Sequence, residues 1–277
     1  MAPEPQPKYH HHVPKFLIQN WAGRESKVWS WNRFERITRE KDPLTVLGEK
    51  YANRFIDLEG QKNVSVERNL ASIESDFSIC VRDLLSQLKL DKLPPLGSPL
   101  VVTLNNLLWN MIVRSPYMRT RHKVNEDFYE EQIVAKILAE QATGAEFQID
   151  TTPLLQDSQE KDNLMQHINV LAFSEASLNA PSNIYQTGIA ISIPRRPNKS
   201  FVLGLNPVGR ILVDGRAMAA LPVAPNVAIS PFGPKGSFST FRIDDNQLRS
   251  FNTMVWNNSD EVVSSSQELL ISLSEQR

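Results

Sequence analysis

The sequence predicts an α+β protein: an N-terminal helical bundle-like part of about four to five helices, then a small antiparallel sheet and a C-terminal helix. Apolar side chains recur at three- and four-residue steps from Val66 to Leu90, as on one face of a long helix. From about Pro181 the pattern changes to short β-branched or alternating runs that prolines divide. Helical patterns thus precede strand patterns instead of alternating with them, which is typical of an α+β fold.

Three further helices are expected before residue 180. After a proline-rich loop, Ser98-Pro99 gives the start signal of a helix that ends at Ser115-Pro116, since proline disfavours helical geometry in its predecessor. Asn125 opens the next helix, with acidic residues in its first turn. Residues 157–160 resemble a capping box for the last of the three.

The segment before Val66 gives weaker signals. Val28 to Trp31 alternates apolar and polar positions and predicts a short strand, and the remainder to about Lys62 is expected to be mixed helix and loop. Residues 1–8 contain three prolines and are predicted to be a flexible leader. Residues 9–277 are predicted to form a single domain, with a helical part at about 9–180 and a sheet-rich part at about 181–277.

The second part of the chain predicts short strands and a closing helix. A helix begins near Asp244-Asp245, and residues 267–273 add a last turn or strand. The strand candidates are residues 189–193, 201–204, 210–213, 227–229 and 241–243.

Composition excludes several function classes. The 277 residues carry 30 basic and 31 acidic side chains, as in ordinary globular proteins, and no stretch has the roughly 20 apolar residues that cross a bilayer. A secretory signal pattern is missing, so no membrane partner and a cytoplasmic location are expected. The lone Cys80 excludes an intramolecular disulfide and any cysteine-based metal centre. Phosphate-loop, nucleophile-elbow and His-Glu-x-x-His motifs are missing too, so the sequence specifies no cofactor, metal or partner.

Two charged residues fall on predicted apolar helix faces. On a wheel of about 100° per residue, Glu74 lies about 40° from Leu70, and Arg114 lies about 40° from Leu100 on the second helix. Burying either charge alone would cost several kcal/mol, so each needs a partner unless it reaches solvent by snorkelling. A buried ion pair that sets the register of the helices is one interpretation. The other is a polar pocket in which Glu74 is a general base or metal ligand and Arg114 holds a substrate anion.

His11 adds a third candidate, because it adjoins an apolar segment that is expected to dock on the core. Neutral imidazole is a common metal ligand and a base near neutral pH. A docking histidine is more often a packing residue, so both interpretations stay open.

A basic run could bind a phosphate backbone. Because the net charge is −1 and no stacking motif accompanies the run, a solvated surface is the favoured interpretation. Its members are Arg114, Arg119, Arg121 and Lys123.

Several fragments together resemble, in order, the motifs of one family. They are His11-His12-Val13-Pro14 with Asn20-Trp21, Ile73-Glu74-Ser75, Val113-Arg114-Ser115-Pro116, Phe201 to Val208, Ile229-Ser230-Pro231, and Asn252. Over nearly its whole length the chain resembles the domain of unknown function 4238 family, whose members are mostly bacterial. The resemblance implies one domain of shared architecture and brings no activity with it.

Polar residues of the matching fragments, together with Arg119 of the basic run, define the candidate site. His11, Glu74 and Arg114 are the candidate catalytic residues, and Asn206, Asn252 and Arg119 are the candidate substrate-binding residues. The chain departs from the family pattern at Leu205, where the pattern has aspartate. Leucine can neither bind a metal nor accept a proton, which favours a diverged, inactive member.

Two functional hypotheses follow. In the first, the chain is an enzyme-like effector of the metal-dependent hydrolase or nuclease type, with His11 and Glu74 as base or metal ligands and Arg114 as anion clamp. In the second, it is a non-catalytic binding or regulatory module in which these three groups form a structural network. Convergence of the three residue types favours the first, and Leu205 favours the second.

Overall fold

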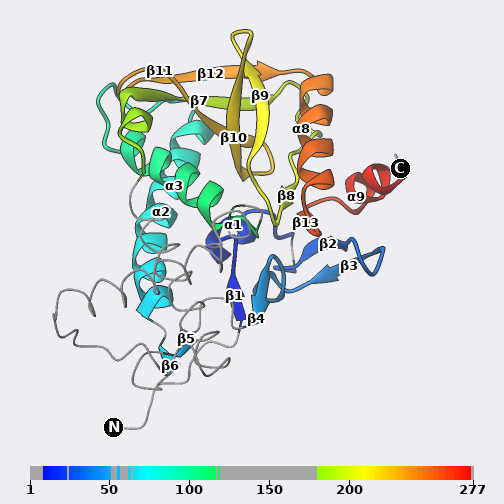
Figure 1. The fold of residues 1–277 in the computed structure, drawn as a ribbon. Coiled ribbons are helices and arrows are strands. Elements are labelled where there is room, and N and C mark those ends of the chain that lie inside the picture. The colour runs from blue at the N-terminus through cyan, green and yellow to red at the C-terminus, as the bar shows by residue number, and fades with distance from the viewer. Residues whose placement is uncertain are drawn as a thin grey trace, which may run out of the picture.

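Strands from both halves of the chain dominate the fold in the computed structural model, which describes residues 9–23, 25–50, 55–56, 62–63, 65–116, 118 and 180–275. They form a five-stranded sheet, a four-stranded sheet and two ribbons of two strands each, β1-β4 and β5-β6 (Figure 1). The ribbon strands are β1 (Tyr9–His11), β4 (Gly48–Lys50), β5 (Phe55–Ile56) and β6 (Lys62–Asn63).

The five-stranded sheet has the order β12-β7-β11-β10-β9 and is antiparallel except where β12 pairs with β7. It curls at β10, because residues 216–220 of that strand pair with β9 and residues 221–224 pair with β11. The β9–β10 hairpin consequently stands across the other three strands in Figure 1. The strands are β7 (Thr187–Pro194), β9 (Gly209–Val213), β10 (Arg216–Ala224), β11 (Val227–Pro234) and β12 (Phe238–Ile243).

The four-stranded sheet has the order β3-β2-β13-β8 and joins early strands to late ones. β13 lies between β2 and β8 and is antiparallel to both. Trp31 of β2 stacks on Trp256, with ring centroids 3.9 Å apart, so helix α8 (Asp245–Asn257) is fixed to the same sheet. The strands are β2 (Val28–Asn32), β3 (Ile37–Lys41), β8 (Leu203–Gly204) and β13 (Glu261–Ser264).

Two long helices, α2 (Ser65–Lys89) and α3 (Leu100–Arg114), lie side by side beneath the five-stranded sheet (Figure 1). α3 packs against β7, β10 and β11 and buries its apolar side, with Leu104 and Leu107 fully covered. Four shorter helical segments complete the described elements: α1 (Lys15–Gln19), α9 (Gln267–Ser274) and the 3₁₀ turns at Pro43–Thr45 and Ser182–Gln186. No helix in the described ranges is long and apolar enough to cross a membrane.

Helix ends follow local chemistry. Asp244 caps α8, because its carboxylate accepts the N–H of Gln247 at 2.9 Å and the Gln247 side chain bonds back to the Asp244 N–H. α2 ends in a Schellman motif. The Lys92 N–H donates a hydrogen bond to the Gln87 carbonyl at 3.0 Å, and the Asp91 N–H donates one to the Leu88 carbonyl at 3.1 Å. Asp91 takes the left-handed position of this motif, with φ +54°, which usually belongs to glycine.

The predicted arrangement of a helical bundle followed by a small antiparallel sheet is wrong. The described residues form a mixed α+β fold dominated by sheets, in which strands begin at Tyr9 and one strand pair, β12 with β7, is parallel. Short strands such as β3, which is Ile-Thr-Arg-Glu-Lys and half exposed, carry no alternating apolar pattern, so periodicity misses them.

The expected long helix, the helix after it and the helix after Asp244 are confirmed as α2, α3 and α8. The expected helices at Asn125 and at 157–160 lie outside the described residues, as does the leader at 1–8.

Candidate functional site

Arg114, the last residue of α3, is buried, with 2% of its surface exposed. Its guanidinium donates one hydrogen bond to the carboxylate of Glu74 on α2 and another, 2.6 Å long, to the backbone carbonyl of His11 on β1. The buried cation thus has an anionic partner and a dipolar partner, as a charge removed from water requires. The wheel prediction that Glu74 and Arg114 could pair is confirmed by this contact.

The antiparallel packing of α2 and α3 brings the pair together. The Cys80 thiol of α2 lies 3.8 Å from the carbonyl of Leu100, the first residue of α3, and Glu74, six residues before Cys80, contacts Arg114 at the other end of α3. Glu74 keeps 24% of its side chain exposed, so one edge of the ion pair faces solvent. The network, named here the Arg114 tie, therefore consists of Arg114, Glu74 and the His11 carbonyl.

His11 joins the Arg114 tie through its backbone and not through its imidazole. The ring Nδ1 lies 3.2 Å from the Val46 carbonyl, which only accepts hydrogen bonds, so Nδ1 carries a proton and donates it. In a neutral ring the acceptor nitrogen would then be Nε2. The residue that sequence reasoning selected for its side chain contributes a carbonyl to the cluster.

The described part of the chain contains no cluster of side chains suited to bind a metal ion. Among those residues, no group of three or more histidine, cysteine, aspartate or glutamate side chains is arranged to hold a metal ion. Burial, aided by the nearby Asp83 carboxylate, raises the pKa of the Cys80 thiol to about 12. The thiol is therefore protonated near neutral pH and is no nucleophile there.

The candidate substrate-binding asparagines make contacts within the protein. Asn252 of α8 is buried; its Oδ1 accepts the Val202 N–H at 3.1 Å and its Nδ2 donates to the Ser200 carbonyl at 2.9 Å. Asn206 donates its backbone N–H to the Ser259 hydroxyl at 3.0 Å and its side-chain amide to the Asn258 carbonyl. Both asparagines therefore attach the β8 region to the end and flank of α8. Arg119 lies outside the described residues, as do Arg121 and Lys123.

Comparison with known proteins gives one result. The sequence profile of the protein of unknown function family DUF4238 matches residues 9–268. The chain belongs to the DUF4238 family. No curated protein and no solved structure matches it.

Leu205, the position at which this DUF4238 chain departs from the family pattern noted above, is half-buried and packs against the core. Its N–H donates to the Glu261 carbonyl at 2.9 Å, so its backbone continues the pairing of β8 with β13. An apolar side chain suits this edge of the core.

Sequence reasoning missed Glu261, a buried carboxylate at the start of β13. One of its oxygens accepts the Ser30 hydroxyl at 2.8 Å and the Lys41 ammonium at 3.0 Å, and the other accepts the Leu47 N–H at 2.7 Å. This carboxylate joins β2, β3 and the segment before β4. No local signal distinguishes it, because its partners lie more than 200 residues earlier in the sequence.

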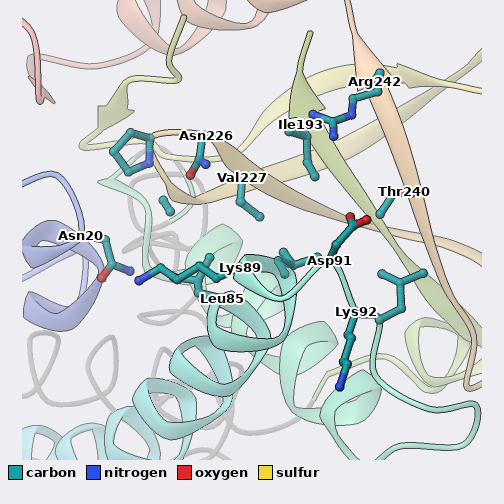
Figure 2. A pocket seen from close by; sticks show the side chains of 14 residues that line it. Asn20, Leu85, Lys89, Asp91, Lys92, Ile193, Asn226, Val227, Thr240 and Arg242 are labelled. Carbon is teal, nitrogen blue, oxygen red and sulfur yellow. The ribbon is translucent and has the colours of Figure 1, made fainter. Parts of the chain in front are cut away.

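Sequence reasoning also missed a cavity of about 600 Å³ between the end of α2 and the five-stranded sheet, named here the α2–sheet pocket (Figure 2). Its lining includes Leu85, Leu88, Lys89, Asp91 and Lys92 from the α2 end, Asn20, and Ile193, Ala224, Asn226, Val227, Thr240 and Arg242 from the sheet side. A second cavity of about 490 Å³ lies between α8 and α9, and Asn252 forms part of its wall.

Proposed function

We propose that this DUF4238 chain is a non-catalytic binding or regulatory module in which the Arg114 tie is structural. The observation that carries the proposal is the burial and bonding of Arg114. The residue is 2% exposed, and its guanidinium donates one hydrogen bond to Glu74 and another to the His11 carbonyl. An anion clamp needs a guanidinium whose donors can reach the ligand. Here both terminal nitrogens are directed at protein groups.

The tie has a clear structural use. It fixes the end of α3 to Glu74 of α2 and to strand β1, three segments that are far apart in sequence. Removing one member would leave a buried charge or carbonyl without its partner, which is strongly destabilising. Such a network holds the scaffold in which ligand-binding surfaces lie.

The enzyme-like alternative stays a prediction, and the contacts favour it less. It needs the Glu74 carboxylate to act on a substrate or a metal, whereas this carboxylate already accepts a bond from Arg114. Leu205 supplies no ligand or base. Arg114 cannot contribute to nucleic-acid binding by the basic run, because its guanidinium is buried in the Arg114 tie.

Two further parts of the proposal concern the whole chain. We infer a single domain over residues 9–277, which is supported by β13 lying between β2 and β8 and by the family match over residues 9–268. We also infer a cytoplasmic location, which is supported by the lone Cys80 as a residue suited to a reducing compartment.

The substitution Glu74→Gln tests the structural role of the tie. Glutamine keeps an acceptor oxygen but removes the charge, so we expect the free energy of unfolding to fall by about 2 kcal/mol. Thermal unfolding followed by circular dichroism would then show a melting temperature lower by about 4–8 °C.

The matched control is Glu35→Gln, which breaks the exposed ion pair between Glu35 and Arg39. An exposed pair contributes little, so this variant should change stability by less than about 0.5 kcal/mol. If Glu74→Gln and Glu35→Gln melted at the wild-type temperature alike, the structural role would be refuted.

A further inference from the structure

We propose that the α2–sheet pocket binds a small organic anion that has an apolar part. This ligand assignment rests on the proposed binding function and names its ligand class. Two features support it: the size and floor of the cavity, and the charges around its rim.

The pocket has the size and floor of a small-molecule site. Its volume of about 600 Å³ lies within the range of roughly 300–1,000 Å³ usual for such sites. Leu85 and Leu88 of α2 line it together with Ile193 of β7 and Val227 of β11. Because these side chains come from two layers of the fold, they would shield an apolar group bound between them from water on more than one side.

Cations exceed anions around the rim. Lys89, Lys92 and Arg242 line the pocket with one carboxylate, Asp91, which gives a local charge of +2 in a chain whose net charge is −1. Within the described residues none of the three cations forms an ion pair with an acidic side chain, in contrast to Arg114 and Lys41. These cations are therefore available to an anionic ligand.

The cations come from opposite sides of the cavity. Figure 2 shows Lys89 reaching from α2 toward Asn20, and Arg242 extending from β12 on the other side. Arg242 pairs in register with Ile193, so its guanidinium lies on the sheet face that forms the apolar floor. A ligand with its apolar part on Ile193 would place its anionic group within reach of that guanidinium.

The helix dipole does not account for this arrangement. Lysines near the end of a helix are favourable on their own, because the last turn carries partial negative charge. That reasoning covers Lys89 and Lys92 only. Arg242 and the polar Asn226 belong to the sheet side of the pocket, so their convergence on the same cavity needs another reason.

Asp91 is the one carboxylate among the described residues of the lining, and a carboxylate at a helix C-terminus opposes the dipole. Its φ of +54° belongs to the Schellman motif that ends α2. Asp91 offsets part of the positive charge around the pocket. Because its carboxylate would repel an anionic ligand, it lowers the affinity and helps to set where the anion lies.

The test compares two dyes of nearly the same shape, the anionic 8-anilino-1-naphthalenesulfonate and the neutral N-phenyl-1-naphthylamine, titrated by fluorescence into the full chain. We expect Arg242→Gln and Lys89→Gln each to weaken binding of the anionic dye roughly three- to tenfold, because each removes one charge interaction at a partly solvated site. Asp91→Asn should tighten it by roughly the same factor. The neutral dye should change by less than about twofold in all three variants.

The matched control is Arg210→Gln, an exposed arginine on β9 that does not line the pocket. It should leave the affinity for both dyes unchanged. Equal affinity of wild type, Arg242→Gln and Lys89→Gln for the anionic dye would overturn the assignment, and so would a loss of both dyes to the same extent in these variants.

The outcome is separable from that of the proposed function. The structural role of the Arg114 tie is decided by the melting temperature of Glu74→Gln, a residue outside the lining of the α2–sheet pocket. If that variant melted at the wild-type temperature while Arg242→Gln still lost the anionic dye, the ligand site would stand and the structural role of the tie would fall.

Discussion

At the scale of single residues, Arg114 illustrates how a buried charge is held by partners of two kinds. The Glu74 carboxylate compensates the charge, and the His11 carbonyl satisfies a second donor without adding one. Glu261 is the reverse case, a buried carboxylate that receives one charged donor and two neutral ones. In both cases every strong partner is a protein group, which favours a role in holding the fold together over a role in chemistry.

Cys80 gives a prediction at the same scale. With a pKa of about 12 the thiol is almost entirely protonated at pH 8, and only the thiolate attacks disulfide reagents. We expect 5,5′-dithiobis(2-nitrobenzoic acid) to release no colour from the folded protein within minutes. The same protein in urea should release one equivalent at once. Rapid reaction of the folded protein would contradict the burial of this side chain.

At the scale of elements, α8 is attached to the sheets through specific contacts. Asn252 bonds the main chain at Ser200 and at Val202. On the side of β9, Gly209 lies so close to the Phe251 ring that a Cβ there would be 2.6 Å from a ring carbon. The helix therefore sits at a fixed distance from β9 that only glycine permits.

Replacing Asn252 by alanine tests this attachment. The variant leaves the Val202 N–H and the Ser200 carbonyl without partners in a buried place, so we expect a loss of about 2–4 kcal/mol in the free energy of unfolding in urea. Asn246→Ala on the same helix is the control, because Asn246 is exposed, and it should cost less than about 0.5 kcal/mol. Equal stability of the two variants would show that Asn252 is available for another role.

At the scale of the whole molecule, the architecture depends on strand pairings that no local sequence pattern predicts. α2, α3 and α8 could be predicted because the apolar periodicity of a helix lies within one continuous segment. β13 could not, since its four residues become a strand only between β2 and β8. β10 could not be predicted either. Its run Ala-Met-Ala-Ala-Leu-Pro-Val-Ala shows no alternation of apolar and polar residues, and its two halves pair with different strands, β9 and β11.

The candidate site divides in the same way. A helical wheel suffices to predict that Glu74 and Arg114 need partners, because both lie on helices. The His11 carbonyl could not be predicted, since a backbone group has no sequence signature. The α2–sheet pocket was also out of reach, because Lys89 and Arg242 are separated by more than 150 positions and converge only when the sheet packs over α2.

The central claim is that the Arg114 tie stabilises the whole fold, and a double-mutant cycle of Glu74→Gln and Arg114→Met in urea unfolding tests it most directly. Contacting members of one network couple by about 0.5–3 kcal/mol, so the double variant should be more stable than the sum of the single losses predicts, by at least about 1 kcal/mol. The corresponding cycle at the exposed pair, Glu35→Gln with Arg39→Met, should give a coupling of about 0.5 kcal/mol or less. Strictly additive losses at Glu74 and Arg114 would contradict the account.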